Sequence, residues 1–169
     1  NGKTVENYID TRLHGDLMIS LRPPADDWEK LWRKNNESHP LVNKWKFLGI
    51  GICVNNLDAA SDYYSQFGLK ASSKKNINKN LRTISQQFLI GKILFELIEA
   101  DQDSIFSDSL EQRGEGVSEI IFLVSDLSKE IEQLENKGTK ILYISSDKKI
   151  ASVASHSKGN ILTRLIQKD

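Results

Sequence analysis

Apolar and polar residues alternate along the chain with a period that changes in a regular order. From Phe47 the period is two, which indicates a half-buried strand, and from Leu57 to about Gly68 the pattern becomes helical. Further strands are expected at 69–74, 81–89 and 92–99, separated by turns at 76–80 and at Gly91. This part of the chain therefore predicts one strand and one helix followed by three strands, an order written βαβββ.

The same order follows a second time, after a short helical connector at 104–112. The predicted elements are a strand at 118–124, a helix at 127–137, and strands at 140–145, 149–154 and 161–167. The predicted fold is therefore α+β, built from two tandem βαβββ units.

Similarity between the two units indicates a duplication. The segment Leu48–Asp58 aligns with Ser118–Ser128, seventy residues later, so that the apolar positions of the two segments coincide. At nearly the same offset, 94–99 (Leu-Phe-Glu-Leu-Ile-Glu) aligns with 162–167 (Leu-Thr-Arg-Leu-Ile-Gln). Two pairs in register are harder to obtain by chance than one, so we infer a tandem repeat from about residue 46 to residue 168.

Residues 1–45 lie outside the repeat and contain all three tryptophans. Two acidic residues precede Trp28 and Trp32, which predicts a helix with acids in its first turn and both indoles on one face. We expect 1–45 to be an N-terminal helical arm or linker, with a further helix or strand before the tryptophans, and 46–169 to be the duplicated domain. The tryptophan face either packs on this domain or contacts an adjacent domain of a larger polypeptide. The start at Asn1 is compatible with a processed product, with a chain trimmed at its start or with a domain of a larger polypeptide, and we favour the last two.

Composition argues against several classes of partner. The chain has 169 residues with 23 basic and 23 acidic side chains, so no net charge attracts nucleic acid or an anionic membrane. The sequence shows neither an apolar run of membrane-spanning length nor a signal peptide. The single cysteine, Cys53, cannot form an internal disulfide. We expect a cytoplasmic protein with no nucleic-acid or membrane partner.

Several motifs in the duplicated region resemble those of one superfamily. They are, in order, Gly49–Ala60 (Gly-Ile-Gly-Ile-Cys-Val-Asn-Asn-Leu-Asp-Ala-Ala), Phe95–Glu99, Arg113–Val117, Ile120–Val124 and Ser157–Leu162. Together with the internal repeat, they resemble the vicinal oxygen chelate superfamily, which has the fold of glyoxalases and dioxygenases, and within it most closely the methylmalonyl-CoA epimerases. The resemblance covers about 120 residues and implies that the two units form a curved eight-stranded cleft.

The resemblance also implies a metal site, but its ligand positions are lost. Members of the superfamily hold one metal in the cleft, and the positions that match its ligands are Gly49, Glu96, Glu119 and Arg164. Glycine has no ligand atom, and arginine is a permanent cation with no lone pair to donate. Two carboxylates alone make a poor site for a metal that normally takes imidazole nitrogens. We predict no metal and no other cofactor.

Alternation along each strand predicts which side chains face the cleft. Gly49, Gly51 and Cys53 face inward from the first strand, and Glu96, Glu119 and Arg164 face inward from three others. Glu96 and Glu119 are the catalytic candidates. The ligand-binding candidates are Arg164, Gly49, Gly51 and Cys53, of which Cys53 is expected to be a small core residue rather than a nucleophile.

Several interpretations of the charged residues are open. Because isolated buried charges are costly, the two glutamates and Arg164 are expected to attract one another, as a salt-bridge cluster where the metal would be. Arg164 could instead bind a ligand carboxylate or thioester oxygen, or a glutamate with a raised pKa could act as a general acid or base. Lys74, Lys75 and Lys79, around a predicted turn, are weaker candidates to meet the phosphates of coenzyme A.

These observations predict a metal-free glyoxalase-like or epimerase-like domain that acts on, or holds, a small carboxylate or acyl thioester within a larger biosynthetic enzyme. A reaction, if there is one, is expected to be a metal-independent isomerase- or lyase-type step. The alternative is a non-catalytic module for ligand binding or assembly. The resemblance leaves open whether one chain closes the cleft or a homodimer does.

Overall fold

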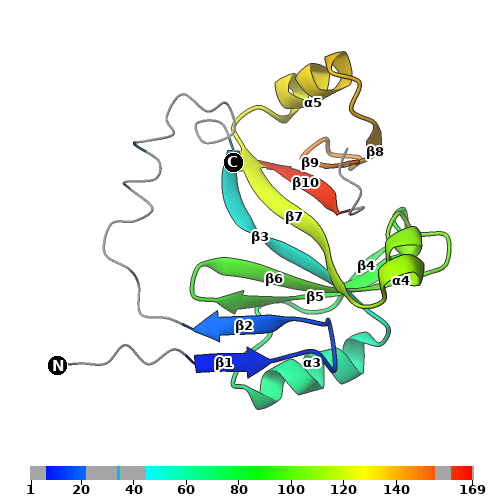
Figure 1. Ribbon diagram of the computed structural model, residues 1–169. Coiled ribbons are helices and arrows are strands. Elements are labelled where there is room, and N and C mark those ends of the chain that lie inside the picture. Colours follow the sequence, from blue (N-terminus) through cyan, green and yellow to red (C-terminus); the bar gives the residue numbers. More distant parts are fainter. Residues whose placement is uncertain (1–6, 22–33, 35–44, 155–160, 169) are drawn as a thin grey trace.

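The computed structural model describes residues 7–21, 34, 45–154 and 161–168, and two βαβββ units follow one another in it (Figure 1). The first consists of β3 (Trp45–Val54), α3 (Leu57–Gln66), β4 (Asn76–Asn78), β5 (Thr83–Ile90) and β6 (Ile93–Ala100). Helix α4 (Ser107–Arg113) leads to the second, which consists of β7 (Gly116–Val124), α5 (Leu127–Asn136), β8 (Ile141–Ile144), β9 (Ile150–Val153) and β10 (Leu162–Gln167). The predicted α+β fold with tandem units is confirmed.

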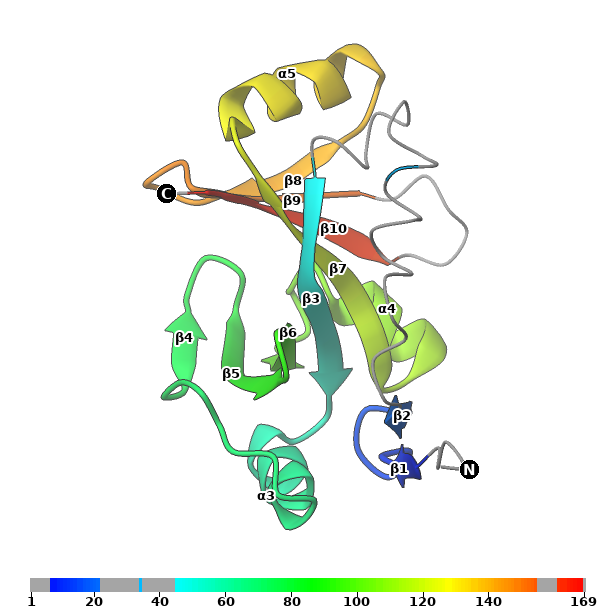
Figure 2. The ribbon, with the colours of Figure 1, turned by 90° about the vertical axis from the view of Figure 1, so that its left-hand side faces the viewer.

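The strands of the two units form one mixed eight-stranded sheet, in the order β4-β5-β6-β3-β7-β10-β9-β8. β3 and β7 lie antiparallel at its centre, and each pairs in parallel with the last strand of its own unit, β6 or β10. The sheet curls into a half-barrel, with α3 and α5 on its outer face and α4 near the opening of its inner face (Figures 1 and 2). The curved eight-stranded sheet agrees with the arrangement that the resemblance implied.

The two outer helices begin at side-chain caps and pack through apolar faces. Asn56 Oδ1 accepts a hydrogen bond from Ala59 N at 2.8 Å, and Asp126 Oδ1 accepts one from Lys129 N at 3.0 Å. The buried residues between the sheet and α3 are Ile52, Val54, Leu57, Ala60, Tyr64, Phe88, Phe95 and Leu97, and those at α5 are Val124, Leu127, Ala151 and Leu165. Because these residues use one side of each strand, the alternate residues face the inner surface of the half-barrel.

One strand differs from the prediction. Residues 69–74 form no strand apart from an isolated bridge at Ala71, and the edge strand β4 lies within the predicted turn at 76–80. Backbone pairing with β5 is brief here: Ser72 N donates to Gln87 O at 2.7 Å, but Gln87 N donates to the side chain of Ser73, at Oγ, at 3.1 Å. Because a hydroxyl can satisfy a backbone group without an extended ladder, the segment touches β5 at Ala71 and Ser72 and joins the sheet as a strand only at β4.

Residues 7–21 form a β-hairpin, not a helix. β1 (Asn7–Asp10) and β2 (Met18–Leu21) pair antiparallel, with Ile9 opposite Ile19. Of the two alternatives for the residues before the tryptophans, the strand is the one observed, and a helical arm is not seen there. The predicted helix at Trp28 and Trp32 lies outside the described residues. No helix among the described residues is long and apolar enough to cross a membrane.

The hairpin packs on the outer side of the first unit. Glu115, between α4 and β7, accepts hydrogen bonds from Gly15 N at 2.6 Å and from Asn55 N at 2.7 Å, and so links the hairpin to the end of β3. Tyr63 Oη on α3 donates to Asp10 O at 2.8 Å. These contacts, far apart in sequence, make residues 7–21 part of the packed structure.

Candidate functional site

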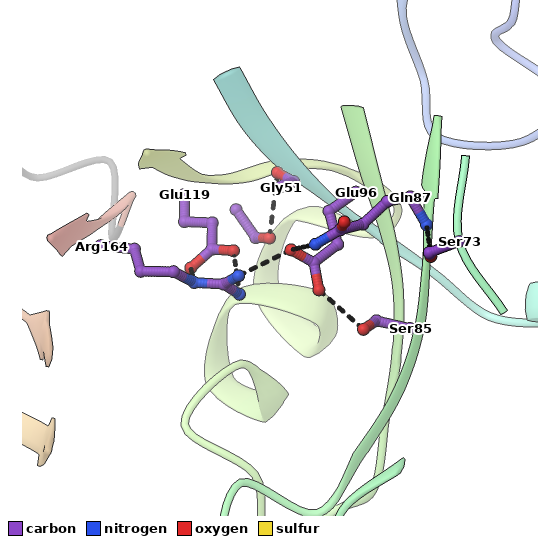
Figure 3. A network of polar contacts seen from close by, with 8 residues as sticks. Gly51, Ser73, Ser85, Gln87, Glu96, Glu119 and Arg164 are labelled. Atoms are coloured by element: carbon purple, nitrogen blue, oxygen red, sulfur yellow. Dashed lines mark hydrogen bonds and ion pairs between the residues drawn. The ribbon is translucent and has the colours of Figure 1, made fainter. Parts of the chain in front are cut away.

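The strand register brings three charged side chains together on the inner face of the sheet. Gly51 of β3 pairs with Glu96 of β6 on one side and with Glu119 of β7 on the other. Leu162 of β10 pairs with Glu119, and Arg164 lies at the next inward-facing position along β10. Glu96, Glu119 and Arg164, called here the charged cluster, therefore converge where the two units meet (Figure 3).

The guanidinium of Arg164 lies between the two carboxylates. Its Nη1 is 2.6 Å from Glu96 Oε2, and its Nε is 3.1 Å from Glu119 Oε2. Nη2 and Glu119 Oε1 form a further ion pair without the angles of a hydrogen bond. The exposed fraction of the side chain is 11% for Arg164, 6% for Glu96 and 0% for Glu119. The expected salt-bridge cluster is therefore present, and it is buried.

Polar neighbours on β5 hold Glu96 in place. Ser85 Oγ donates to Glu96 Oε1 at 2.7 Å, and Gln87 Nε2 lies 3.5 Å from Glu96 Oε2 (Figure 3). The sequence analysis did not select Ser85 or Gln87. Period two on β5 places both on one face, but only the register with β6 shows that this face is the one that carries Glu96.

Burial changes the acid–base properties of the cluster. It raises the pKa of Glu119 to about 7 against the opposing attraction of Arg164, and repulsion from Glu96 adds to the rise. Burial also disfavours the charge on Arg164, but attraction to the two carboxylates outweighs it, and the pKa of Arg164 is raised above its usual value. The cluster therefore combines a permanent cation with a carboxyl group that exchanges its proton near neutral pH.

The free energy of unfolding is expected to rise by about 2 kcal/mol between pH 8 and pH 5.5 because of Glu119. Its pKa is raised from 4.5 to about 7 by folding, so its contribution to stability is full below pH 4.5 and is lost as the pH rises through 7. Chemical denaturation across this range measures it, as the difference between the wild type and Glu119→Gln, whose amide cannot titrate. A difference that does not change with pH would contradict the raised pKa.

The two glycines on the inner face of β3 allow close approaches. A Cβ added at Gly51 would lie 2.4 Å from Glu119 Cγ, so the absence of a side chain makes room for Glu119. A Cβ added at Gly49 would lie 1.9 Å from Leu94 O on the neighbouring strand. These two ligand-binding candidates therefore shape the cluster and the sheet through the space that they leave.

Cys53 lies away from any open surface. It is 1% exposed and packs with Ile98, Phe106 and Leu162 beneath the segment around α4. Burial raises the pKa of its thiol to about 11. A protonated, enclosed thiol is a packing element of the inner face and a poor nucleophile.

The positions that match the metal ligands of the resembled superfamily do not fit a metal in this chain. Gly49 has neither a ligand atom nor space for one. Arg164 places a positive charge between Glu96 and Glu119, where the metal would be. Within the described residues, no group of three or more His, Cys, Asp or Glu side chains is arranged to hold a metal ion.

Among the cavities that the described residues form, two border the sheet. The larger, of about 440 Å³, lies on the inner side between α4 and the second unit, and Leu162 is in its wall. Its other lining residues are Asp103, Ser104, Ile105, Ser107, Asp108, Ser109, Leu142 and Ala154. Its volume is in the range of small-molecule sites. The smaller, of about 330 Å³, lies at the start of β5 and the end of β6. Neither cavity has a residue of the charged cluster in its lining.

The lysines considered for phosphate contacts lie apart from the larger cavity. Lys75 forms an ion pair with Asp58 at the start of α3. Lys79 lines the smaller cavity, together with Arg82. Neither lysine, nor Lys74, is among the residues that line the larger cavity, so a phosphate role for them remains a prediction.

Comparison with known proteins supports one superfamily. The profile described as the Glyoxalase/Bleomycin resistance protein/Dioxygenase superfamily matches residues 49–157, whereas no curated protein sequence matches. The structure is similar to that of methylmalonyl-CoA epimerase from Mycobacterium tuberculosis, with 21% identity, coverage of 73% of this chain and 87% of that chain, and a TM-score of 0.61. It is also similar to a methylmalonyl-CoA epimerase in complex with methylmalonyl-CoA and NH4+, with 24% identity, coverage of 74% and 95%, and a TM-score of 0.61. A Streptomyces coelicolor methylmalonyl-CoA epimerase in complex with 2-nitronate-propionyl-CoA gives 24% identity, coverage of 73% and 96%, and a TM-score of 0.60. At these identities the similarity to the solved structures concerns the fold.

Proposed function

Because the chain belongs to the Glyoxalase/Bleomycin resistance protein/Dioxygenase superfamily, we propose that its inner face binds a small acyl thioester or carboxylate without a metal. The charged cluster takes the place of the metal, and the cavity beside Leu162 receives the ligand. Two of the similar structures are complexes with methylmalonyl-CoA and with 2-nitronate-propionyl-CoA, which supports an acyl-CoA or a related thioester as the ligand class.

The position of Arg164 is the observation that carries this proposal. An arginine has five N–H donors, and the contacts with the two glutamates involve one on Nε and one on each Nη nitrogen. Two N–H groups lie outside these contacts and are suited to a ligand oxygen. Because the carboxylates hold the guanidinium in a buried, poorly screened place, such a hydrogen bond would be stronger than one at the surface.

The same cluster could support a proton transfer. A general acid or base is most effective when its pKa is close to the working pH, and the pKa of Glu119 is about 7. In the proposed step, the Glu119 carboxylate takes a proton from the carbon next to the thioester carbonyl, and Arg164 stabilises the negative charge that forms on the carbonyl oxygen. Delivery of a proton from solvent to the opposite face of the same carbon, with loss of the first proton from Glu119 to solvent, inverts that carbon and completes an isomerase-type reaction.

A module that holds a ligand without reaction is the second candidate function. The observation that favours it is the burial of Glu119, whose side chain is 0% exposed and fully engaged with Arg164. In that case the cluster only joins the two units and supports the wall of the cavity.

Metal content and ligand stabilisation test the proposed site. We expect purified protein to contain far less than a stoichiometric amount of metal, and propionyl-CoA to raise its melting temperature in the presence of a chelator, because a ligand that binds only the folded state stabilises it. Elemental analysis and a thermal-shift series measure both. A stoichiometric metal, or stabilisation that the chelator removes, would overturn the metal-free site.

Glutamine variants separate catalysis from binding within the same experiment. If Glu119 transfers a proton, Glu119→Gln should abolish the exchange of the substrate's α-hydrogen with solvent and keep the thermal shift. Glu132→Gln, at an exposed position on α5, is the matched control. Binding without any exchange in the wild type would leave the holding module as the function.

A further inference from the structure

A buried hydroxyl beside the charged cluster lacks a partner. Ser152 of β9 is 1% exposed, and its Oγ makes no hydrogen bond to any residue that the structure describes. Buried polar side chains nearly always have a partner, because an unpaired hydroxyl loses its hydrogen bonds to water and gains none in return. The hydroxyl is therefore suited to a group that the described chain does not supply.

Ser152 lies opposite Arg164 of the charged cluster and one inward-facing position away from residues that line the larger cavity. It is the cross-strand partner of Arg164 in the antiparallel pair of β9 and β10, and directly opposed residues of such a pair share one face of the sheet. Ala154, two residues further on and on that face, lines the larger cavity together with Leu162. Leu162 in turn lies two residues before Arg164. The lining of the cavity ends one inward-facing position before Ser152, so a ligand that continued from the cavity along these two strands would meet this hydroxyl first.

The charges along this path favour a neutral ligand group. Two carboxylates against one guanidinium give the cluster a net charge of −1 when all are ionised and 0 when one carboxylate is protonated, so it is positive only if both carboxyl groups are protonated. Asp103 and Asp108 also line the cavity, and among the residues that the structure describes only Asp103 has an ion pair, with Arg82. A free carboxylate would enter a region of negative charge with little screening. A neutral carbonyl oxygen requires only a hydrogen-bond donor, which a hydroxyl provides.

We propose that Ser152 is a ligand-binding residue whose Oγ–H donates to the carbonyl oxygen of a neutral acyl group, while the apolar part of the ligand lies on Leu142, Ala154 and Leu162. This inference rests on the proposed function and narrows it from a carboxylate or thioester to a neutral acyl thioester. Ser152 then selects ligands whose carbonyl oxygen lies within hydrogen-bond distance of its Oγ. Arg164 donates a hydrogen bond to the same oxygen or to another ligand oxygen next to it.

The role of Ser152 is tested by removing its hydroxyl, the carbonyl oxygen of the ligand, or both, and comparing the four binding affinities. The probes are S-propionyl-N-acetylcysteamine, a neutral thioester, and S-propyl-N-acetylcysteamine, the thioether that lacks the carbonyl oxygen. Calorimetric titration of the wild type is expected to give about tenfold tighter binding of the thioester, and Ser152→Ala should bind both probes with the affinity of the thioether. If the preference for the thioester over the thioether differs by less than about twofold between the wild type and Ser152→Ala, the inference is overturned.

A matched serine and an anionic probe complete the experiment. Ser61→Ala removes a hydroxyl that donates to Gln86 Oε1 at 3.0 Å on the outer face, so it should keep the wild-type coupling but melt at a lower temperature. Ser152→Ala should not melt at a lower temperature than the wild type, since its hydroxyl has no hydrogen-bond partner among the described residues to lose, and a lower value would overturn the inference.

Propionate should bind at least about tenfold more weakly than the thioester, and equal affinity would overturn the preference for a neutral group. If the wild type binds neither thioester nor thioether, the proposed function itself fails, whereas binding of both without coupling overturns only the role of Ser152.

Discussion

Replacing Arg164 with methionine is expected to lower the free energy of unfolding by about 3–5 kcal/mol. The substitution keeps most of the side-chain volume but leaves Glu96 and Glu119 without a counter-charge, with 6% and 0% of their side chains exposed. Protonation of Glu119, whose pKa is already raised by burial, relieves part of the cost, so the loss should be smaller at pH 5.5 than at pH 8. Chemical denaturation at the two pH values measures both effects.

A surface arginine and a charge-free combination serve as controls for this prediction. Arg82 pairs with Asp103, but the two side chains are 53% and 76% exposed, so Arg82→Met should cost no more than about 1 kcal/mol. Combining Arg164→Met with Glu96→Gln and Glu119→Gln removes every charge of the cluster and should recover about 2 kcal/mol. If Arg164→Met is as mild as Arg82→Met, the cluster does not join the two units in the way that its burial indicates.

Replacing Gly49 with alanine is expected to cost about 3 kcal/mol, at the upper end of the range for overpacked sites. The added Cβ would lie 1.9 Å from Leu94 O and 2.7 Å from Leu94 Cβ, and both atoms are held by the parallel pairing of β3 with β6. The neighbour is not a flexible side-chain end that can turn aside, so the two strands must separate. Chemical denaturation measures the loss, and amide hydrogen exchange should show weaker protection on β6 than on β10.

A turn glycine is the matched control for Gly49. Gly138 has φ +78° and no atom within 4 Å of an added Cβ, so Gly138→Asn, which tolerates this backbone conformation, should cost less than about 1 kcal/mol. Gly49→His, which restores the residue that the superfamily uses as its first metal ligand, should likewise destabilise the protein and give no stoichiometric zinc binding by calorimetry. Zinc binding by this variant would show that the position is open and that the loss of the histidine alone abolished the site.

Most of the fold was predictable because its signals are local. Period two on β3 and β7 and helical periods on α3 and α5 are properties of short segments, and the internal repeat then related the two units. The misplaced edge strand shows the limit of such signals. Residues 69–74 are compatible with a strand, but Ser73 satisfies Gln87 N with its side chain, and this contact depends on a strand that follows later in the chain.

The candidate site was predictable to the level of which residues face inward. Alternation placed Glu96, Glu119 and Arg164 on the inner face, and the cost of unpaired charge predicted their attraction. The same argument did not select Ser152 or Ser85, because a serine in a strand is unremarkable until its neighbours on the next strand are known. Their importance comes from cross-strand pairing with Arg164 and with the strand of Glu96.

The order of residues was enough to predict the duplicated α+β architecture and the inward position of the charged residues, since both follow from residue type, short-range period and the internal repeat, whereas the loss of the metal-ligand set was predicted from the resemblance to the superfamily. Which charges meet, and how deeply, depended on folding. Arg164 is 68 positions from Glu96 and 45 from Glu119, and only the central pairing of β3 with β7 brings these strands together. Burial then decides the chemistry, because removing Glu119 from water raises its pKa to about 7, and no local pattern in the sequence determines how much water remains around a side chain.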